Sequence, residues 1–354
     1  MRTRLSLVLA LVLAVSSLAA AALTASAPAS AAIGPQVTNA CLASVPEPNS
    51  EEPVQICYTL FRPEGASRSD RVPMIMHSHG WGGSRTTDPA AFERYLEHGY
   101  GVLSFDQRGF GESGGQAHVE NPSFEGHDVR RLIALIASKS WVRKDAPGDP
   151  RMGAIGGSYG GGYQFLAAFE SLRLRGTPVL DALAPEITWF DLKQSLAPEE
   201  VVRTEWAVAL SAAAVPTNAL PTPIYEALVE GAATGMWPDG SGPSGVDLDA
   251  FFRRNGPKWH VDHGRRLDIP ALLGQGTTDT LFPLEQGITN FRRAITRDAR
   301  AESIFVGYNG GHTLPSVLPP GFATAGDPCS IALGSSSFSG LALRFMSTKL
   351  LGKG

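Results

Sequence analysis

A serine between glycines is the residue of this sequence best placed to act as a nucleophile. Residues 156–160 read Gly-Gly-Ser-Tyr-Gly, directly after the apolar run 152–155 and just before the helix-like run 163–170. A tight strand-to-helix turn needs small residues beside the serine and leaves its hydroxyl exposed at the start of the helix. The helix dipole favours developing negative charge at that point. The pattern therefore predicts that Ser158 attacks a carbonyl carbon.

A serine nucleophile needs a base to take its proton and a carboxylate to orient that base. His312 lies in the Gly-rich loop 309–313, which follows the strand-like segment 302–308. Asp279 lies in a turn after an earlier strand-like segment, and the interval to His312 is long enough for one helix and one strand. The chain order serine, acid, histidine is one of the known arrangements of a catalytic triad. We predict Ser158, Asp279 and His312 as the catalytic residues.

The other histidines are weaker candidates for the base. His260 and His263 have the spacing of a metal pair, but no cysteine or carboxylate cluster accompanies them, so we expect neither a metal nor a cofactor. His77 and His79 flank the end of a predicted strand and are expected to shape the following loop. The histidines expected to be ordinary solvated side chains are His98, His118 and His127.

Two backbone N–H groups are needed to hold the oxyanion of the intermediate. One belongs to the residue after the nucleophile, Tyr159, and the other to the loop after an earlier strand. That loop is 79–83, His-Gly-Trp-Gly-Gly, after the predicted strand 72–78. We predict the N–H groups of Trp81 and Tyr159 as the oxyanion hole, with the Trp81 ring lining the acyl site. The alternative is that the ring of Trp81 packs in the core, which is compatible with a backbone donor.

The loop after the apolar segment 101–105 reads Asp-x-Arg-Gly-x-Gly-x-Ser. We expect Asp106 and Arg108 to be structural and to stabilise this loop beside the oxyanion turn. Asp106 comes too early in the chain order to be the acid of the triad.

The elements that must position these residues alternate between strand-like and helix-like segments, which predicts an α/β fold with a mostly parallel central sheet flanked by helices. Alternation lapses between residues 189 and 267, where helices are expected over 191–214 and 225–235. We interpret this segment as a helical cap insertion, and expect a last helix over 337–351. Four tryptophans are candidates to line the pocket or to form the core of the cap: Trp189, Trp206, Trp237 and Trp259.

These features resemble a known family. The chain is similar to α/β-hydrolase serine enzymes of the X-prolyl dipeptidyl-peptidase and cocaine-esterase-like group, over about residues 50–350. The resemblance rests on Asp-Gln-Arg-Gly at 106–109, Trp141, Gly-Gly-Ser-Tyr-Gly-Gly at 156–161 and Leu-Ala-Pro-Glu-Ile-Thr at 183–188. It implies an α/β-hydrolase fold with Ser158 as nucleophile, Asp279 as acid and His312 as base.

Two features depart from that group. Its members usually carry a β-sandwich domain after the catalytic domain, whereas only residues 313–354 follow His312 here. Some members use a tyrosine hydroxyl in the oxyanion hole, where this chain has His-Gly-Trp at 79–81. We therefore expect hydrolysis of a carboxylic ester or amide through an acyl-enzyme, with an X-Pro dipeptidyl-peptidase as the alternative. An acyltransferase and an inactive binding protein on the same scaffold are further alternatives, although the complete set of serine, aspartate and histidine argues against the second.

The N-terminal segment 1–32 predicts export. It has a basic start at Arg2 and Arg4, an apolar run over 5–23 and small residues at 29–32, which is typical of a secretory signal peptide. A membrane anchor is the alternative, because the apolar run is long enough to span a bilayer. We expect residues 33–354 to form the catalytic domain of a secreted protein with no membrane contact after cleavage.

Composition and cysteine content agree with such a protein. The formal net charge is −4, without a basic patch, so we expect a small-molecule ester or peptide as substrate and no nucleic-acid partner. Cys41 and Cys57 lie in strand-like stretches joined by the Pro-rich turn 46–50, and a hairpin would bring them together. Cys329 is a possible partner for either, so the pairing stays open. Disulfides are typical of an oxidising compartment.

Overall fold

In a computed structural model of the protein, residues 34–313 and 337–352 are described. The predicted signal peptide and Cys329 lie outside these residues. Within the described part of the chain, no helix is both long and apolar enough to cross a bilayer.

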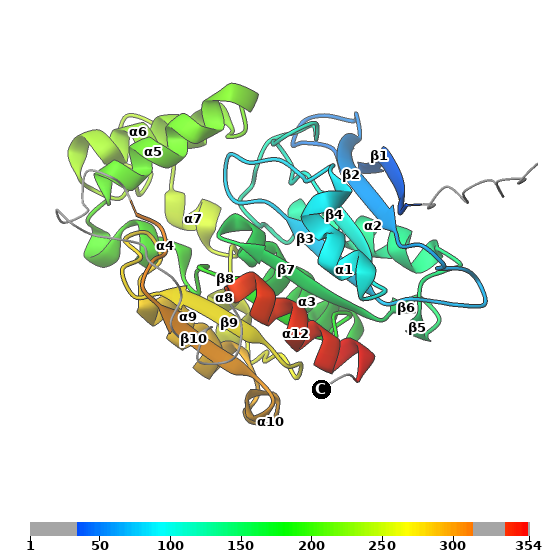
Figure 1. Cartoon of the computed structure of the whole chain (residues 1–354). Helices are drawn as coiled ribbons and strands as arrows, with labels where there is room; N and C mark the ends of the chain where they lie inside the picture. Colours follow the sequence, from blue (N-terminus) through cyan, green and yellow to red (C-terminus); the bar gives the residue numbers. More distant parts are fainter. Residues whose placement is uncertain (1–33, 314–336, 353–354) are drawn as a thin grey trace, which may run out of the picture. The chain divides into compact units, whose positions relative to one another are not determined.

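An eight-stranded sheet, with the order β1-β2-β4-β3-β7-β8-β9-β10, forms the centre of the described residues (Figure 1). The pairs β1–β2 and β2–β4 are antiparallel, and all pairs from β4 onward are parallel. The predicted, mostly parallel α/β sheet is therefore confirmed. Its strands are β1 (Gln36–Ser44), β2 (Val54–Arg62), β3 (Met74–Ser78), β4 (Gly101–Phe105), β7 (Met152–Gly157), β8 (Ala182–Glu186), β9 (Leu272–Gly276) and β10 (Ile304–Tyr308); β5 (Lys144–Ala146) and β6 (Asp149–Pro150) form a separate small hairpin.

Helices cover both faces of this sheet, and the strand residues alternate between the two cores. In β3, Met74 and Met76 pack into one core while Ile75 packs into the other. The core of Met74 and Met76 lies under α2 (Glu125–Ser138) and α3 (Tyr159–Arg175). The opposite core is covered by α1 (Glu93–Glu97) and α12 (Phe338–Leu351) (Figure 1). Connections of this kind bring the carboxyl ends of the parallel strands to one edge.

The chain between β8 and β9, residues 187–271, is mostly helical; we call it the helical insertion, and it includes the cap predicted over 189–267. It contains α4 (Leu192–Leu196), α5 (Thr204–Ala214), α6 (Thr222–Thr234), α7 (Leu248–Phe252) and α8 (Pro257–Asp262). The helical region expected over 191–214 contains two separate helices, α4 and α5. Pro198 offers no backbone N–H, and both Glu199 and Glu200 adopt positive φ, so the chain turns between them. Two further helices, α9 (Leu284–Thr289) and α10 (Arg297–Ala301), lie between β9 and β10 in the chain.

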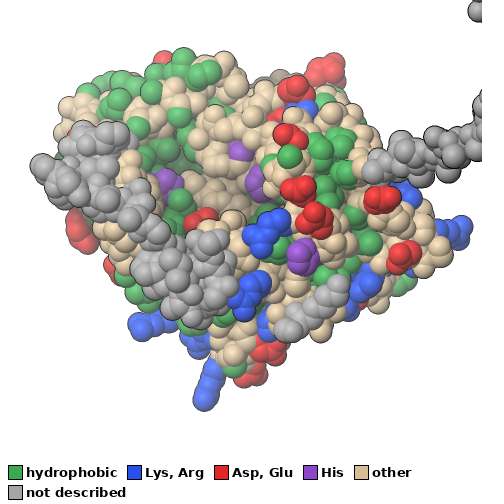
Figure 2. Space-filling model, in the orientation of Figure 1, with side chains coloured by type: hydrophobic (Ala, Val, Ile, Leu, Met, Phe, Trp, Pro, Cys, Tyr) green, Lys and Arg blue, Asp and Glu red, His purple; other side chains and the backbone are tan. Residues whose placement is uncertain are grey.

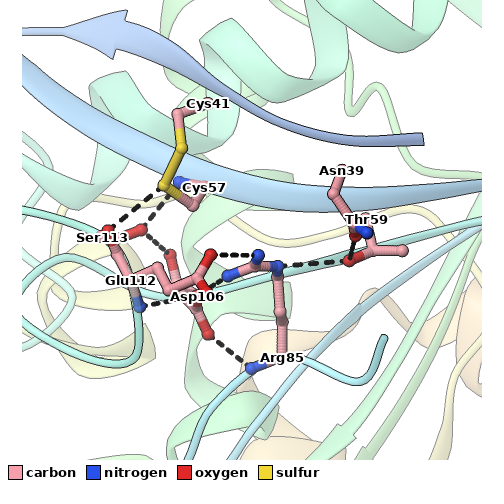
Figure 3. The surroundings of a disulfide bond; sticks show 8 residues. All are labelled: Asn39, Cys41, Cys57, Thr59, Arg85, Asp106, Glu112 and Ser113. Carbon is pink, nitrogen blue, oxygen red and sulfur yellow. Dashed lines mark hydrogen bonds and ion pairs between the residues drawn. A yellow bond between two sulfur atoms is a disulfide. The ribbon is translucent and has the colours of Figure 1, made fainter. Parts of the chain in front are cut away.

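A disulfide joins the first two strands. Cys41 and Cys57 are directly opposed in the β1–β2 register and are bonded, as the predicted hairpin allowed (Figure 3). The Cys57 N–H donates to Ser113 Oγ at 2.8 Å, and this hydroxyl donates to the carbonyl oxygen of Asp106. Arg85 pairs with the carboxylates of Asp106 and Glu112 in the same loop. The expected structural role of Asp106 is thus visible as a network that ties its loop to β2.

Arg108 is fully buried and belongs to a second network. Its guanidinium donates to Asp128 at 2.8 and 2.9 Å and to Glu47 at 2.9 Å. His118 also bonds Glu47, at 2.7 Å, and its ring stacks on Phe124. The expectation of a solvated His118 is wrong, because these partners, distant in sequence, bury it to 7 % exposure.

The charge of Glu47 is stabilised by these contacts. Burial works to raise the pKa of the Glu47 carboxyl, but the hydrogen bonds from His118, the Gln116 N–H and Arg108 outweigh it and lower that pKa to about 2. Glu47 therefore stays ionised wherever the protein is folded at ordinary pH.

Arg108→Met is expected to destabilise the protein by about 3–5 kcal/mol, because buried Asp128 loses its countercharge. The free energy of unfolding from urea denaturation measures this loss. Arg68→Met, at an exposed position, is the control and is expected to change that free energy by less than about 0.5 kcal/mol. Equal unfolding midpoints for the two variants would contradict the role of Arg108 as the stabilising countercharge of Asp128.

Candidate active site

Ser158 lies between β7 and α3 with φ 57° and ψ −121°, a left-handed backbone that residues other than glycine rarely adopt. Its N–H donates to the carbonyl of Glu186 at 2.9 Å, and its own carbonyl accepts from Gly161 at 2.8 Å. The flanking glycines are sterically required. A Cβ on Gly160 would lie 2.4 Å from the Ser78 carbonyl oxygen, and one on Gly156 would lie 2.6 Å from that of Gly160. The turn predicted from the Gly-x-Ser-x-Gly pattern therefore has the geometry that lifts the serine hydroxyl out of the sheet.

The structure brings the three predicted triad residues together. Nε2 of His312 lies 2.7 Å from Oγ of Ser158, and Nδ1 of His312 lies 2.8 Å from Oδ2 of Asp279. Since a carboxylate only accepts, Nδ1 carries the ring hydrogen and Nε2 is left to accept the serine proton. This arrangement can activate a hydroxyl for attack on a carbonyl carbon.

The carboxylate of Asp279 is buried and saturated with donors. Oδ1 accepts the N–H groups of Leu281 and Phe282 at 2.9 and 2.7 Å, and Oδ2 accepts the N–H of His312 at 2.9 Å. Gln275 adds its side-chain amide at 3.4 Å and donates to the carbonyl of Phe282 at 2.6 Å. Gln275 was not predicted as a site residue, because a single glutamine inside an apolar strand belongs to no recognised motif.

Both predicted oxyanion residues lie beside the serine. Tyr159 is the first residue of α3, where a backbone N–H has no acceptor within the helix. The loop of Trp81 runs past the nucleophile, since a Cβ on Gly80 would lie 3.6 Å from Cβ of Ser158. The Trp81 ring lines the neighbouring cavity, and its Nε1 donates to the carbonyl of Leu210 at 2.9 Å. The Trp81 ring thus both packs against the insertion and lines the cavity. The role of the Trp81 backbone N–H in the oxyanion hole remains a prediction.

The loop of Trp81 is fixed by His79, one of the two histidines expected to shape it. Nε2 of His79 accepts the N–H of Gln107 at 3.1 Å, and the side chain of Gln107 donates to the carbonyl of His79 at 3.2 Å. These bonds join the predicted oxyanion loop to the loop of Asp106 and Arg108.

A narrow cavity of about 60 Å³ opens beside Ser158. Apart from Ser158, its walls are aliphatic and aromatic, and they come from both the sheet domain and the helical insertion. They are Trp81, Val119, Tyr159, Trp189, Leu192, Leu196, Val202, Ala207, Leu210, Leu220, Leu228, Trp237, Phe252, Leu281 and Phe282. Hydrophobic side chains also gather on the outside of α5 and α6, among them the exposed Val208 and Val229 (Figure 2). The described cavity walls thus present apolar surface beside the hydroxyl of Ser158.

Of the four tryptophans considered for the cap, Trp189 and Trp237 line this cavity. Trp206 packs against the same apolar cluster and against His312. Trp259 lies on α8 beneath the guanidinium groups of Arg254 and Arg265. Among the described residues, no group of three or more histidine, cysteine or carboxylate side chains is arranged to hold a metal.

Comparison with known proteins identifies the family. The family model described as X-Pro dipeptidyl-peptidase (S15 family) matches residues 52–313, most of the chain. The chain belongs to this family. The resemblance inferred from the motifs is thereby confirmed, and the fold is that of an α/β-hydrolase.

The chain is also similar, more distantly, to several known proteins. The chain is 28% identical to a non-heme chloroperoxidase of Streptomyces lividans over 225 residues, covering 60% of this chain and 76% of the relative. It is 32% identical to an uncharacterized 31.7 kDa protein of Escherichia coli over 122 residues, covering 34% of this chain and 40% of the relative. An acylaminoacyl peptidase of Pyrococcus horikoshii superposes with a TM-score of 0.57 at 14% identity, over 91% of this chain and 43% of the peptidase. The chain thus spans less than half the length of the last two proteins, and the peptidase supports the fold alone.

Proposed function

We propose that the protein is a secreted carboxylic ester hydrolase that acts on small or medium-sized uncharged esters through an acyl-enzyme on Ser158. The observation that carries this proposal is the hydrogen-bonded series Ser158, His312 and Asp279 at the wall of an apolar cavity. The helical insertion acts as the cap that shapes the cavity.

In this mechanism His312 takes the proton of Ser158 as the hydroxyl oxygen attacks the carbonyl carbon. The N–H groups of Trp81 and Tyr159 hold the resulting oxyanion. His312 then returns the proton to the leaving alkoxide, and the acyl group remains on the serine. A water molecule, deprotonated by His312, attacks the acyl-enzyme and releases the acid. The carboxylate of Asp279 accepts the Nδ1 hydrogen of His312 and stabilises the imidazolium.

The cavity walls favour an ester over an N-terminal dipeptide. A free peptide amino terminus is an ammonium group, and burying it requires a carboxylate or several carbonyl acceptors. No charged side chain is among the described residues that line the cavity. An alkoxide also leaves more readily than an amine. The second candidate function, an X-Pro dipeptidyl-peptidase, is favoured by the family to which the chain belongs.

Export is part of the proposal. The basic and apolar pattern of residues 1–32 is that of a signal peptide. The Cys41–Cys57 disulfide supports an oxidising destination, because such bonds are rare in reducing compartments.

Dipeptide esters with a free and with an acetylated amino terminus separate the two functions. If the cavity takes an uncharged acyl group, we expect Ala-Pro p-nitrophenyl ester to be cleaved more slowly than its N-acetyl derivative, by about tenfold or more in kcat/KM. In the same assay, simple p-nitrophenyl esters should be cleaved with a higher kcat/KM than Ala-Pro p-nitroanilide. A preference for the free amino terminus in both the ester and the anilide would establish the peptidase instead.

A further inference from the structure

The imidazole of His312 lies between two aromatic rings from different parts of the chain. Phe282, in the turn after β9, meets it at a ring-centroid distance of 5.1 Å and an interplanar angle of 85°. Trp206, on α5 of the insertion, meets it at 5.9 Å and 90°. Both contacts are edge-to-face, an arrangement that aromatic rings prefer. The sheet domain and the insertion therefore both confine the ring.

Thr280 connects the same tryptophan to the backbone of the histidine. Nε1 of Trp206 donates to Thr280 Oγ1 at 3.2 Å, and Oγ1 in turn donates to the His312 carbonyl oxygen at 3.0 Å. The Thr280 N–H donates to that same carbonyl at 2.9 Å. Arg203, just before α5, donates to the carbonyl of Thr280 at 2.8 Å. The insertion thus holds the turn of Thr280, and this turn holds the loop of His312.

The loop of His312 needs such support. Gly310 and Gly311 precede the histidine with φ of 150° and 110°. Glycine is required at position 311, because a Cβ there would lie 2.5 Å from Cβ of Asp279. Two consecutive glycines also leave the backbone free to adopt many conformations. Within the triad the imidazole is held by one hydrogen bond to Asp279 and one to Ser158, so contacts from outside the triad help to decide how closely Nε2 stays on Ser158.

We infer that Trp206 and Thr280 are positioning residues for His312, and that α5 is part of the catalytic apparatus in addition to a wall of the cavity. This inference rests on the proposed role of His312 as the base. It predicts that loosening these contacts slows proton transfer while leaving the cavity, and hence substrate binding, largely as it is.

Thr280→Val and Thr280→Ser test the inference. Valine has nearly the shape of threonine but loses the hydroxyl, so kcat for a p-nitrophenyl ester is expected to fall by about tenfold to a hundredfold. KM should stay within about twofold, because no cavity wall changes. The rate of fluorophosphonate labelling of Ser158 should fall with kcat. Serine restores the hydroxyl and is expected to restore both rates.

Trp206→Phe and Trp206→Ala test the contact from α5. Phenylalanine keeps an edge-to-face ring without the N–H, and alanine removes both, so kcat should fall further in the second variant. Trp259→Phe is the matched control in the insertion, since Trp259 lies under Arg254 and Arg265 and is not among the residues that line the cavity. It is expected to leave both kcat and KM unchanged.

Normal kcat in Thr280→Val, or equal losses in Thr280→Val and Thr280→Ser, would overturn the inference. Full activity of Ser158→Ala would instead overturn the proposed function, so the two failures are distinguishable. Thermal unfolding of each variant shows whether a loss of kcat reflects a loss of folded protein.

Discussion

Ser158→Ala is expected to abolish ester hydrolysis, with kcat falling by about a millionfold, and to abolish labelling by a fluorophosphonate. The substitution removes one oxygen, which lies 2.7 Å from His312 Nε2. The strained backbone of the elbow is still held by the residues around it. Because the hydroxyl contributes little packing, the thermal unfolding midpoint should change little. Turnover of a p-nitrophenyl ester and mass spectrometry of the labelled protein measure the result.

Ser69→Ala, at an exposed position, is the control and should keep full activity. Labelling of Ser158→Ala at another serine, with retained turnover, would place the nucleophile elsewhere.

Asp279→Asn is expected to lower kcat by about ten thousandfold. Asparagine can still accept the N–H groups of Leu281 and Phe282 through Oδ1, so the turn should fold as before. Its amide nitrogen, however, would face Nδ1 of His312, which disfavours the ring tautomer that leaves Nε2 free to accept the serine proton. Steady-state kinetics together with an unfolding curve separate this effect from a loss of stability.

Asp268→Asn is the matched control, because Asp268 is exposed and bonds Thr296. Near-normal turnover of Asp279→Asn would mean that another carboxylate is the acid of the triad. The next candidate to test would be Glu186, which lies at the end of β8 beside the elbow.

The proximity of the three predicted triad residues could be predicted from the sequence because each of them follows a short apolar strand. Parallel strands carry their loops at one edge of the sheet, so Ser158, Asp279 and His312 meet there although they are far apart along the chain. The elbow was predictable for a local reason, since its serine and glycines lie together at 156–160, although the close contacts that require Gly156 and Gly160 include the Ser78 carbonyl oxygen on β3. The same local logic made the β1–β2 hairpin, and with it the meeting of Cys41 and Cys57, visible in advance.

Contacts between distant segments were not predictable in this way. Nothing near His118 in the sequence indicates that Glu47 binds it, so its burial was missed. Trp206 was noted as a cap residue, but its bond to Thr280 depends on how α5 folds back onto the sheet domain. The break between α4 and α5 depends on two glutamates in left-handed conformations, which residue preferences disfavour. Each of these results from tertiary packing, which the periodicity of a single segment does not encode.

The disulfide between β1 and β2 has a consequence for how the chain matures. Cys41 and Cys57 face each other directly across the two strands, and side chains alternate between the faces of a sheet. If the hairpin slipped by one residue, one sulfur would turn to the opposite face and the pair would be out of reach. The Cys41–Cys57 disulfide can therefore form only in molecules whose first two strands are paired in the correct register. A misaligned molecule keeps two reactive thiols besides Cys329, which leaves it open to thiol exchange and renewed attempts at pairing.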